Sequence, residues 1–289
     1  MLIRPIVKQF LDELPNRPRA TLFPTGITQM DREVWFSKQN LNIVAGRPSN
    51  NKSTFILNNL AVPTAESGMK VIIYSLEDRK DRYAQRYLAN KCGIENKRIQ
   101  HNEVNENETT MLHQHKDTMD ELPLDIIEDI GYEIEQIEKD LEQRNPDMVI
   151  VDYINKIHTK NANRLETVND YLRRFSLMSK QKNFCAVVCC QVNREAMGEG
   201  NTGKVKPPML HHIKESGDIE QIADVAMLLH WEYKYSLSAS KNQIQVIVAK
   251  NKDGDTGVFN CKIEPEYNRI TNLTVPGVAI DAFAQEGMI

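Results

Sequence analysis

The chain has 289 residues, of which 26% are charged, and this length accommodates one large α/β domain with short appendages. Its formal net charge of −4 excludes a wholly basic nucleic-acid binder, so any contact with DNA must come from a local patch. The five cysteines lack paired C-x-x-C spacing and no apolar run is long enough to span a bilayer, so we expect a cytoplasmic protein without disulfides, zinc or membrane contact.

A short amphipathic helix is predicted over residues 3–14, before Pro15 stops the pattern. Its apolar face comprises Ile6, Phe10, Leu11 and Leu14. This helix either folds back on the core of its own chain or lies in a groove of a neighbouring copy, and we favour the neighbour. The turn-rich segment 23–27 then leads into the first core strand.

Residues 41–60 carry a phosphate-binding pattern, in which a strand-like apolar run is followed by Gly46, a polar loop and an apolar-periodic helix that opens at Lys52. Such a loop presents backbone N–H groups and the positive end of a helix to an anion. A lysine at its end reaches the β- and γ-phosphates, and the next hydroxyl binds Mg²⁺. Lys52 and Ser53 hold these two positions. The predicted nucleotide-binding residues are Gly46, Arg47, Pro48, Ser49, Asn50, Asn51, Lys52, Ser53 and Thr54.

The loop departs from the usual G-x-x-x-x-G-K-[ST] pattern at Asn51, where glycine is expected. Glycine is used where φ must be positive, and asparagine tolerates the left-handed region best after glycine. We therefore expect the loop to form, with a Cβ near the phosphates. An ordinary strand-to-helix turn with a chance lysine is the alternative interpretation.

The next buried strand, residues 71–76, ends at Glu77. A carboxylate at the carboxyl end of a central parallel strand, beside the strand that feeds the phosphate loop, is well placed to activate water. We therefore predict that Glu77 is the catalytic base, and a solvated strand-end acid is the alternative. A helix over 79–90 follows, whereas the polar segment 101–119 is expected to be an irregular surface loop.

A strand at 124–127 and an acidic amphipathic helix at 131–144 precede a second apolar run, 148–153, which contains Asp152. Four apolar residues followed by aspartate form the Walker B pattern, whose acid holds Mg²⁺ or its water. Ser53 and Asp152 are therefore the predicted metal-binding residues.

After a helix at 166–182, the apolar strand 184–190 ends beside Gln191. A glutamine at this place can contact the γ-phosphate when it is present, and its change of position on hydrolysis can move the next loop. That loop, 195–209, carries three glycines with Lys204 and Lys206, which suits contact with a nucleic-acid backbone, and a plain disordered loop is the alternative.

Strands are also predicted at 223–231 and 244–250, with an antiparallel-looking piece at 258–263. Lys250 and Lys252 stand at the end of the second of these. In a ring of such domains, cations at this place would face the phosphates bound by a neighbour.

The order of these elements resembles the C-terminal ATPase domain of DnaB-type replicative helicases. The matching stretches are PTGI, AGRPSNNKST, YSLED, VIVDY, CQVNRE, IKESGDIEQIADVAMLLH and AKNKDG. The resemblance implies an α/β, RecA-like P-loop domain with a central, mostly parallel twisted sheet flanked by helices and preceded by a short N-terminal linker helix. It divides the chain into an N-terminal helix and linker (1–22), the ATPase domain (23–273) and a C-terminal tail (274–289).

The resemblance also implies ATP and Mg²⁺ as cofactors and gives roles to individual residues. Glu77 would polarise the attacking water, Arg86 would support the site in cis, and Gln191 would be the γ-phosphate sensor. Lys250 matches the family's lysine, and Lys252 its arginine finger, which both act on the nucleotide bound by a neighbouring subunit. The residues assigned to single-stranded DNA are Arg194, Lys204, Lys206, Lys214, Glu215 and Gly217. The N-terminal helix resembles one that docks on the adjacent subunit, which predicts a homo-hexamer, with a primase, a loader or a host helicase as candidate partners.

Three departures from the family pattern bear on activity. Asn51 replaces a glycine, Lys252 replaces an arginine and loses its bidentate fork, and the family's N-terminal primase-interacting domain is missing. The chain is then a minimal helicase, a truncated form, or a relative that gave up part of the chemistry. We predict an ATP-dependent replicative DNA helicase, a ring-forming motor on single-stranded DNA with hydrolysis at subunit interfaces. The alternative is a weakly hydrolysing or inactive relative that acts as an ATP-gated DNA clamp or regulates a host helicase.

Overall fold

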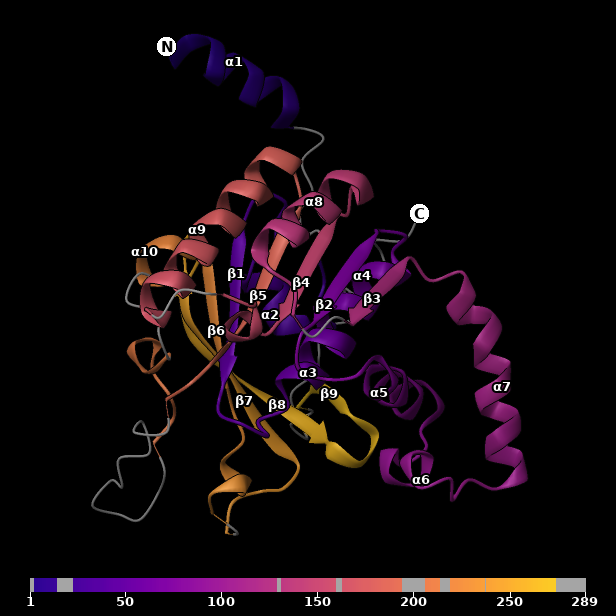
Figure 1. The fold of residues 1–289 in the computed structure, drawn as a ribbon. Coiled ribbons are helices and arrows are strands. Elements are labelled where there is room, and N and C mark those ends of the chain that lie inside the picture. Colours follow the sequence, from indigo (N-terminus) through magenta and orange to yellow (C-terminus); the bar gives the residue numbers. More distant parts are fainter. Residues whose placement is uncertain are drawn as a thin grey trace.

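The computed structural model describes residues 3–14, 23–128, 131–159, 163–193, 206–213, 219–236 and 238–273. Within these residues the strands form one nine-stranded sheet with helices on both faces (Figure 1). The strands are β1 (Leu41–Gly46), β2 (Val71–Ser75), β3 (Leu124–Glu128), β4 (Met148–Asp152), β5 (Cys185–Gln191), β6 (Val225–His230), β7 (Gln243–Asn251), β8 (Gly257–Glu264) and β9 (Arg269–Asn272).

The helices alternate with the strands along most of the chain. The α-helices are α1 (Ile3–Glu13), α2 (Thr28–Glu33), α3 (Lys52–Phe55), α4 (Val62–Glu66), α5 (Lys80–Cys92), α6 (Asn96–Gln100), α7 (Glu106–Asp120), α8 (Ile134–Arg144), α9 (Arg164–Lys182) and α10 (Ile219–Ile222). A π-helical turn, η2 (Ile56–Ala61), joins α3 to α4, and the short 3₁₀ turns are η3 (Ile154–Lys156), η5 (Leu210–His212), η6 (Glu232–Lys234) and η7 (Pro265–Tyr267).

The sheet has the strand order β3-β2-β4-β5-β1-β6-β7-β8-β9, in which the first six strands are parallel and the last three antiparallel. The central parallel strands are buried throughout, as their unbroken apolar sequences require when helices cover both faces. β8 instead alternates buried and exposed residues, as a strand with one wet face does. The predicted fold class, a mostly parallel sheet flanked by helices, is confirmed.

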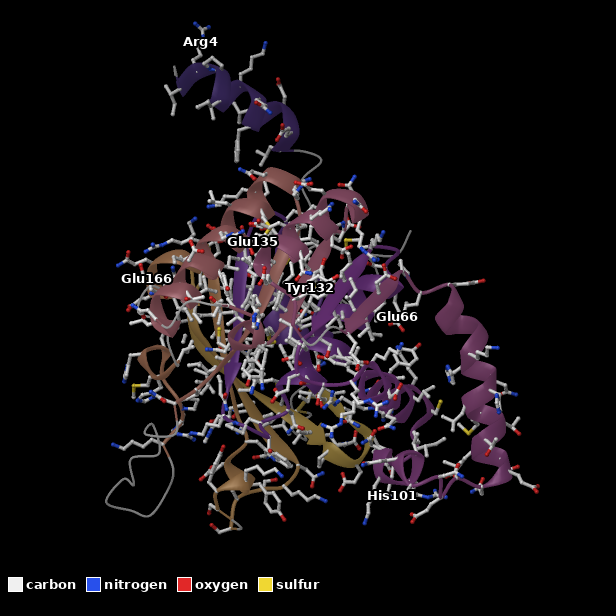
Figure 2. The ribbon with its side chains drawn as sticks, in the orientation of Figure 1. Arg4, Glu66, His101, Tyr132, Glu135 and Glu166 are labelled. Carbon is white, nitrogen blue, oxygen red and sulfur yellow. The ribbon has the colours of Figure 1, made fainter. Side chains whose placement is uncertain are left out.

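Two apolar cores fill the space between the sheet and its helices. On one face the helices that follow β1 and β2 bury Phe55, Leu60 and Tyr83. On the other face α8 and α9 bury Ile137 and Phe175. Tyr132, labelled in Figure 2, packs on the second of these cores. Its ring centre lies 6.0 Å from that of Tyr74 in β2.

The segment 101–119 is a correction to the sequence analysis, because most of it forms helix α7 rather than an irregular loop. Its start is fixed by a reciprocal cap, in which Glu108 N–H donates to Asn105 Oδ1 and Asn105 N–H donates to the Glu108 carboxylate, both at 2.9 Å. α7 packs against α5 (Figure 1). Helix α2 and the edge strand β9 were not predicted either.

Helix α1 forms as predicted and exposes its apolar face. The large apolar side chains that are exposed on α1 and the residue after it are Ile3, Ile6, Val7, Phe10, Leu11 and Leu14. Side chains surround the helix, with Arg4 near its outer end (Figure 2). Among the described residues, no helix has both the length and the apolar composition needed to cross a bilayer.

Candidate nucleotide site

The candidate site lies at the carboxyl edge of the parallel strands. The sheet register pairs Gly46 with Gln191 and Ser75 with Asp152, so the ends of β1, β5, β2 and β4 come together. A cavity of about 560 Å³ opens there, and the predicted side chains that line it are Lys52, Ser53, Glu77, Arg86, Asp152 and Gln191. Four separate segments of the chain therefore contribute to one cavity, as the crossover connections of such a sheet dictate.

The phosphate loop lines one side of this cavity. Six of its nine predicted residues lie on the wall, namely Pro48, Ser49, Asn51, Lys52, Ser53 and Thr54. The other three, Gly46, Arg47 and Asn50, do not line the cavity and are buried. At Gly46 an added Cβ would lie 3.2 Å from the carbonyl oxygen of Leu229, so the close approach of β6 favours glycine there.

Two non-glycine residues give the loop its shape. Asn51, which precedes α3, has φ +62° and ψ 28°, and Ser49 has φ +63°. The left-handed conformation expected for Asn51 is therefore present, and asparagine adopts it at lower cost than most residues. Ser49 was not foreseen, because nothing in the sequence marks a serine for positive φ.

Asn50 fastens the loop to the segment that follows β6. Its side-chain Nδ2 donates to the hydroxyl of Tyr235 at 2.6 Å, and its Oδ1 accepts from the backbone N–H of Trp231 at 2.8 Å. The guanidinium of Arg47 lies over the ring of Tyr235, 5.0 Å from its centre. The loop is thus held in shape by contacts to residues about 180 positions later in the chain.

Lys52 extends back along its own loop. Its Nζ donates to the carbonyl oxygen of Gly46 at 3.1 Å and lies 3.4 Å from that of Arg47. The ammonium group is therefore held at the cavity wall by the strand end that precedes the loop. The lysine at this place in the motif is the one that reaches phosphate oxygens in proteins with such a loop.

Ser53 and Asp152, the two predicted metal-binding residues, are in direct contact. Ser53 Oγ donates to Asp152 Oδ2 at 2.8 Å. The same carboxylate oxygen accepts from the hydroxyl of Tyr83 at 2.6 Å. Asp152 is 4% exposed, so these hydrogen bonds stabilise a carboxylate that has little contact with water.

Glu77 follows β2 and lines the same cavity. The expectation that its strand lies beside β1 is wrong, because β4 and β5 lie between the two strands. Its side chain reaches solvent, yet the surrounding protein desolvates the carboxylate enough to raise its pKa above the ordinary value. The charge of Lys156 opposes this shift, whereas that of Asp152 adds to it. A strand-end glutamate with a raised pKa beside a cavity has the property expected of a general base.

Arg86 lines the same cavity and is held in place by an acid that sequence reasoning did not single out. Its guanidinium donates to Asp78 Oδ2 at 2.6 Å, and Arg82 donates to Asp78 Oδ1 at 2.9 Å. Burial opposes the ionisation of Asp78, but the two arginines outweigh it and lower the pKa of this carboxyl. Arg86 is thus fixed at the cavity wall in the same chain.

Gln191 ends β5 and lines the cavity, half-buried. The next residue, Val192, forms a bridge with Ile213, and Asn193 N–H donates to the carbonyl oxygen of His212 at 2.8 Å. The strand end is therefore bonded to the segment 206–213.

Of the predicted DNA-binding residues, Lys206 is described and exposed, and those that lie outside the described residues are Arg194, Lys204, Lys214, Glu215 and Gly217.

Lys250 and Lys252 do not line this cavity. β7 is antiparallel to β6 and pairs Asn251 with Val225, the first residue of β6, so both lysines lie at the amino edge of the parallel strands. Lys252 Nζ is 3.1 Å from Asp224 Oδ1, and Lys250 Nζ donates to the carbonyl oxygen of Glu220 at 2.7 Å. The sheet therefore separates these cations from the phosphate loop of their own chain.

Comparison with known proteins agrees with this geometry. The family model for the DnaB-like helicase C terminal domain matches residues 23–272. The chain belongs to the DnaB-like helicase C-terminal domain family. Curated relatives of this DnaB-like chain include replicative DNA helicase DnaC of Bacillus subtilis, 29% identical over 276 residues, and replicative DNA helicase DnaB of Geobacillus stearothermophilus, 28% identical over 279 residues. Each alignment covers 91% of the chain and 59% of the relative, so the chain spans little more than half of their length.

Solved structures show the same DnaB-like fold. One solved ATPase domain superposes with a TM-score of 0.84 at 24% identity, over 94% of this chain and 99% of that one. A DnaB-like replicative helicase, solved in a study of its interactions with primase, gives a TM-score of 0.83 at 23% identity, over 95% of this chain and 67% of that one.

Sequence reasoning missed two supporting residues of this DnaB-like site, Asp78 and Tyr83, and it predicted Asn50 as a nucleotide-binding residue without its role in holding the loop. Asn50 and Tyr83 bond to partners that are far away in the sequence, so no local sequence pattern indicates these contacts. Asp78 had a local signal, because Arg82 lies four positions after it and an acid and an arginine at this spacing can pair near the start of a helix.

Proposed function

We propose that this DnaB-like domain is the motor of an ATP-dependent DNA helicase, a ring of six copies that moves on single-stranded DNA and hydrolyses ATP between copies. The observation that supports this most is the separation of charges. Lys52 and Asp152 line the cavity, whereas Lys250 and Lys252 lie at the opposite edge of the sheet. Such a site gains its second set of cations only when another copy supplies them.

The donor set fits Mg²⁺, which prefers hard oxygen ligands and takes few of them from the protein. Ser53 supplies a hydroxyl and Asp152 a carboxylate, in contact at 2.8 Å. When bound, Mg²⁺ neutralises charge that develops on the phosphates. We propose ATP as the nucleotide.

Each side chain at the cavity has a proposed role in hydrolysis. Lys52 neutralises phosphate oxygens, and Glu77 orients the attacking water and accepts its proton. Arg86, fixed by Asp78, adds positive charge from the same chain. Gln191 passes the state of the γ-phosphate to the segment paired with Val192.

Partners follow from the exposed surfaces. The apolar face of α1 would dock on the neighbouring copy and hold the ring together, since a helix with so many large apolar side chains exposed needs cover. The segments 194–217, including Lys206, would contact the DNA backbone. A primase, a loader or a host helicase is the proposed protein partner.

We place the activity in the cytosol, where five free cysteines stay reduced. We assign it to residues 23–273, with residues 1–22 as an N-terminal helix and linker and residues 274–289 as a C-terminal tail.

We further propose that turnover is slow for this kind of motor. Asn51 puts a Cβ on the phosphate loop, and Lys252 offers a point charge where an arginine would offer a planar fork with several donors. An arginine finger accelerates phosphoryl transfer by about 10³- to 10⁵-fold, so its replacement by lysine reduces the rate without removing the charge.

The variant Glu77→Gln tests the proposal. It should abolish DNA-stimulated ATP hydrolysis, a loss of about 10²-fold or more, because the amide accepts no proton. ATP should remain bound with an affinity close to that of the unaltered protein. In the unaltered protein, hydrolysis should fall as the pH drops through the raised pKa of Glu77, because the base must be ionised. The measurements are ATPase rate with and without single-stranded DNA, nucleotide affinity, and mass in solution.

Glu103→Gln is the matched control, because Glu103 is an exposed acid that does not line the cavity. It should leave both rate and affinity unchanged. Unchanged turnover in Glu77→Gln would remove Glu77 as the base. A protein that stays monomeric with ATP and ignores single-stranded DNA would contradict the motor as a whole.

A further inference from the structure

The hydroxyl of Tyr83 makes an unusual contact for a core tyrosine. Tyr83 lies on α5, its side chain is fully buried, and its ring belongs to the core between α5 and the sheet. Its Oη donates to Asp152 Oδ2 at 2.6 Å, across 69 residues of sequence. The partner is the acid of the nucleotide site, rather than a nearby backbone carbonyl.

A buried tyrosine hydroxyl needs a hydrogen-bond partner, so the contact could serve the stability of the core alone. The geometry argues for more than structure. Tyr83 and Ser53 donate to the same carboxylate oxygen, at 2.6 and 2.8 Å, so the two donors together fix the orientation of the carboxylate.

We propose that Tyr83 is a positioning residue, which holds the Asp152 carboxylate in the orientation in which it and Ser53 bind Mg²⁺. The inference rests on the proposed function, because it concerns the same metal site. A carboxylate at a strand end can rotate about its side-chain bonds, and a charge-assisted hydrogen bond limits that rotation. Groups that orient metal ligands in this way typically contribute about 10- to 100-fold to metal affinity.

Helix α5 therefore reaches the site at two points. Tyr83 holds the metal-binding acid, and one turn later Arg86 lies with its guanidinium 5.4 Å from the centre of the Tyr83 ring. Arg86 is in turn bonded to Asp78 at the start of the helix. A displacement of α5 would move the donor to Asp152 and the guanidinium together, so the two contacts are coupled through one rigid element.

The variant Tyr83→Phe tests the role, because it removes one oxygen and keeps the ring in the core. The affinity for ATP should be measured over a range of Mg²⁺ concentrations and again with the metal chelated. The Mg²⁺ concentration for half-maximal tightening of ATP binding should rise about 10-fold. ATP affinity without metal should stay within about 2-fold of the unaltered protein, because Tyr83 does not line the cavity.

Tyr87→Phe is the matched control. Tyr87 lies one turn further along α5 and is 3% exposed, but it neither lines the cavity nor bonds to Asp152. It should leave the Mg²⁺ dependence unchanged. A second background, Asp152→Asn, shows whether Tyr83 acts through Asp152, since coupled residues are not additive. There, Tyr83→Phe should cause no further rise in the Mg²⁺ requirement.

The outcomes separate the two proposals. A Mg²⁺ dependence in Tyr83→Phe equal to that of the unaltered protein overturns the role of Tyr83 alone, as does an equal rise in the Asp152→Asn background. A fall in the Mg²⁺ requirement overturns it too, because Tyr83 would then compete with the metal. If the unaltered protein binds ATP with no dependence on Mg²⁺, the proposed function fails and the role of Tyr83 fails with it.

Discussion

The two ends of strand β1 carry different halves of the proposed reaction. At its carboxyl end, side chains bond to one another at short range, with Asp152 taking hydrogen bonds of 2.6 and 2.8 Å while 4% exposed. At its amino end, the side chain of Lys252 is 62% exposed and rests on Asp224 at 3.1 Å. One end is organised within the chain, and the other presents its charge outward.

This difference agrees with the proposed division of roles between the two edges of the sheet. Asp224 Oδ2 accepts from the backbone N–H of Leu41 at 2.9 Å, so this acid belongs to the sheet and stays in place. The hydrogen bond and charge of Asp224 raise the pKa of Lys252, which keeps it protonated. Lys252 is the exposed member of this ion pair, and the buried Asp224 keeps its bond to Leu41, so Lys252 can move to a stronger anion without leaving the acid unpaired. A fixed pocket at one edge and a releasable cation at the other suit a site shared between copies.

The largest expected effects come from removing one lysine at each edge. Lys52→Ala should weaken ATP binding about 100-fold or more, because it removes the charge that meets the phosphates. Lys252→Ala should leave ATP binding within about 2-fold but lower the rate of hydrolysis by about 10²-fold or more, because its charge acts on the transition state. Nucleotide affinity and single-turnover rates measure the two effects.

The control for both is Lys262→Ala, an exposed lysine on β8 that pairs with Glu264 at 3.0 Å. It should change neither quantity. If Lys252→Ala weakens ATP binding as strongly as Lys52→Ala, the two edges are not functionally distinct.

A smaller effect is expected at Asn51, the residue at φ +62°. Asn51→Gly should raise ATP affinity or turnover several-fold, because glycine adopts this conformation freely and brings no Cβ to the phosphates. Titration of nucleotide binding and the steady-state rate measure the change. A loss of activity would show that the asparagine side chain has a positive role.

The smallest effect is expected at Tyr235, which holds Asn50 from outside the loop. Tyr235→Phe removes the 2.6 Å hydrogen bond and should weaken ATP binding about 5-fold, equivalent to about 1 kcal/mol. Tyr233→Phe, in the same turn, should have no such effect, because the ring of Tyr233 packs on Trp231 and its hydroxyl makes no bond to Asn50. Equal losses in both variants would mean that the whole turn, rather than this bond, supports the loop.

Much of the carboxyl edge could be predicted from sequence, because its parts are local. A glycine after an apolar run, a lysine that opens a helix, and acids at strand ends each leave a pattern within a few residues. Since parallel strands bring their carboxyl ends to one edge, Lys52, Glu77, Asp152 and Gln191 were expected to meet, and all line one cavity.

The remaining features depend on contacts that no local pattern records. In the sequence Tyr83 looks like an ordinary core residue, because its bond to Asp152 depends on where β4 lies in the fold. Asn50 looks like an ordinary loop residue, because its bond to Trp231 depends on where the turn after β6 lies. Helix α7 is different, because its signal was local but overlooked. Asn105 and Glu108 form a capping pair, although the segment after them is as polar as an irregular loop.

Mixing two inactive variants tests most directly whether the two edges of the sheet form one shared site. Lys52→Ala and Lys252→Ala are combined in equal amounts under conditions that allow copies to exchange. A pocket with Lys52 intact then meets a neighbour with Lys252 intact at about a quarter of random interfaces. We predict that ATP hydrolysis recovers toward that fraction of the unaltered rate. A mixture no more active than its two components would contradict a site divided between copies.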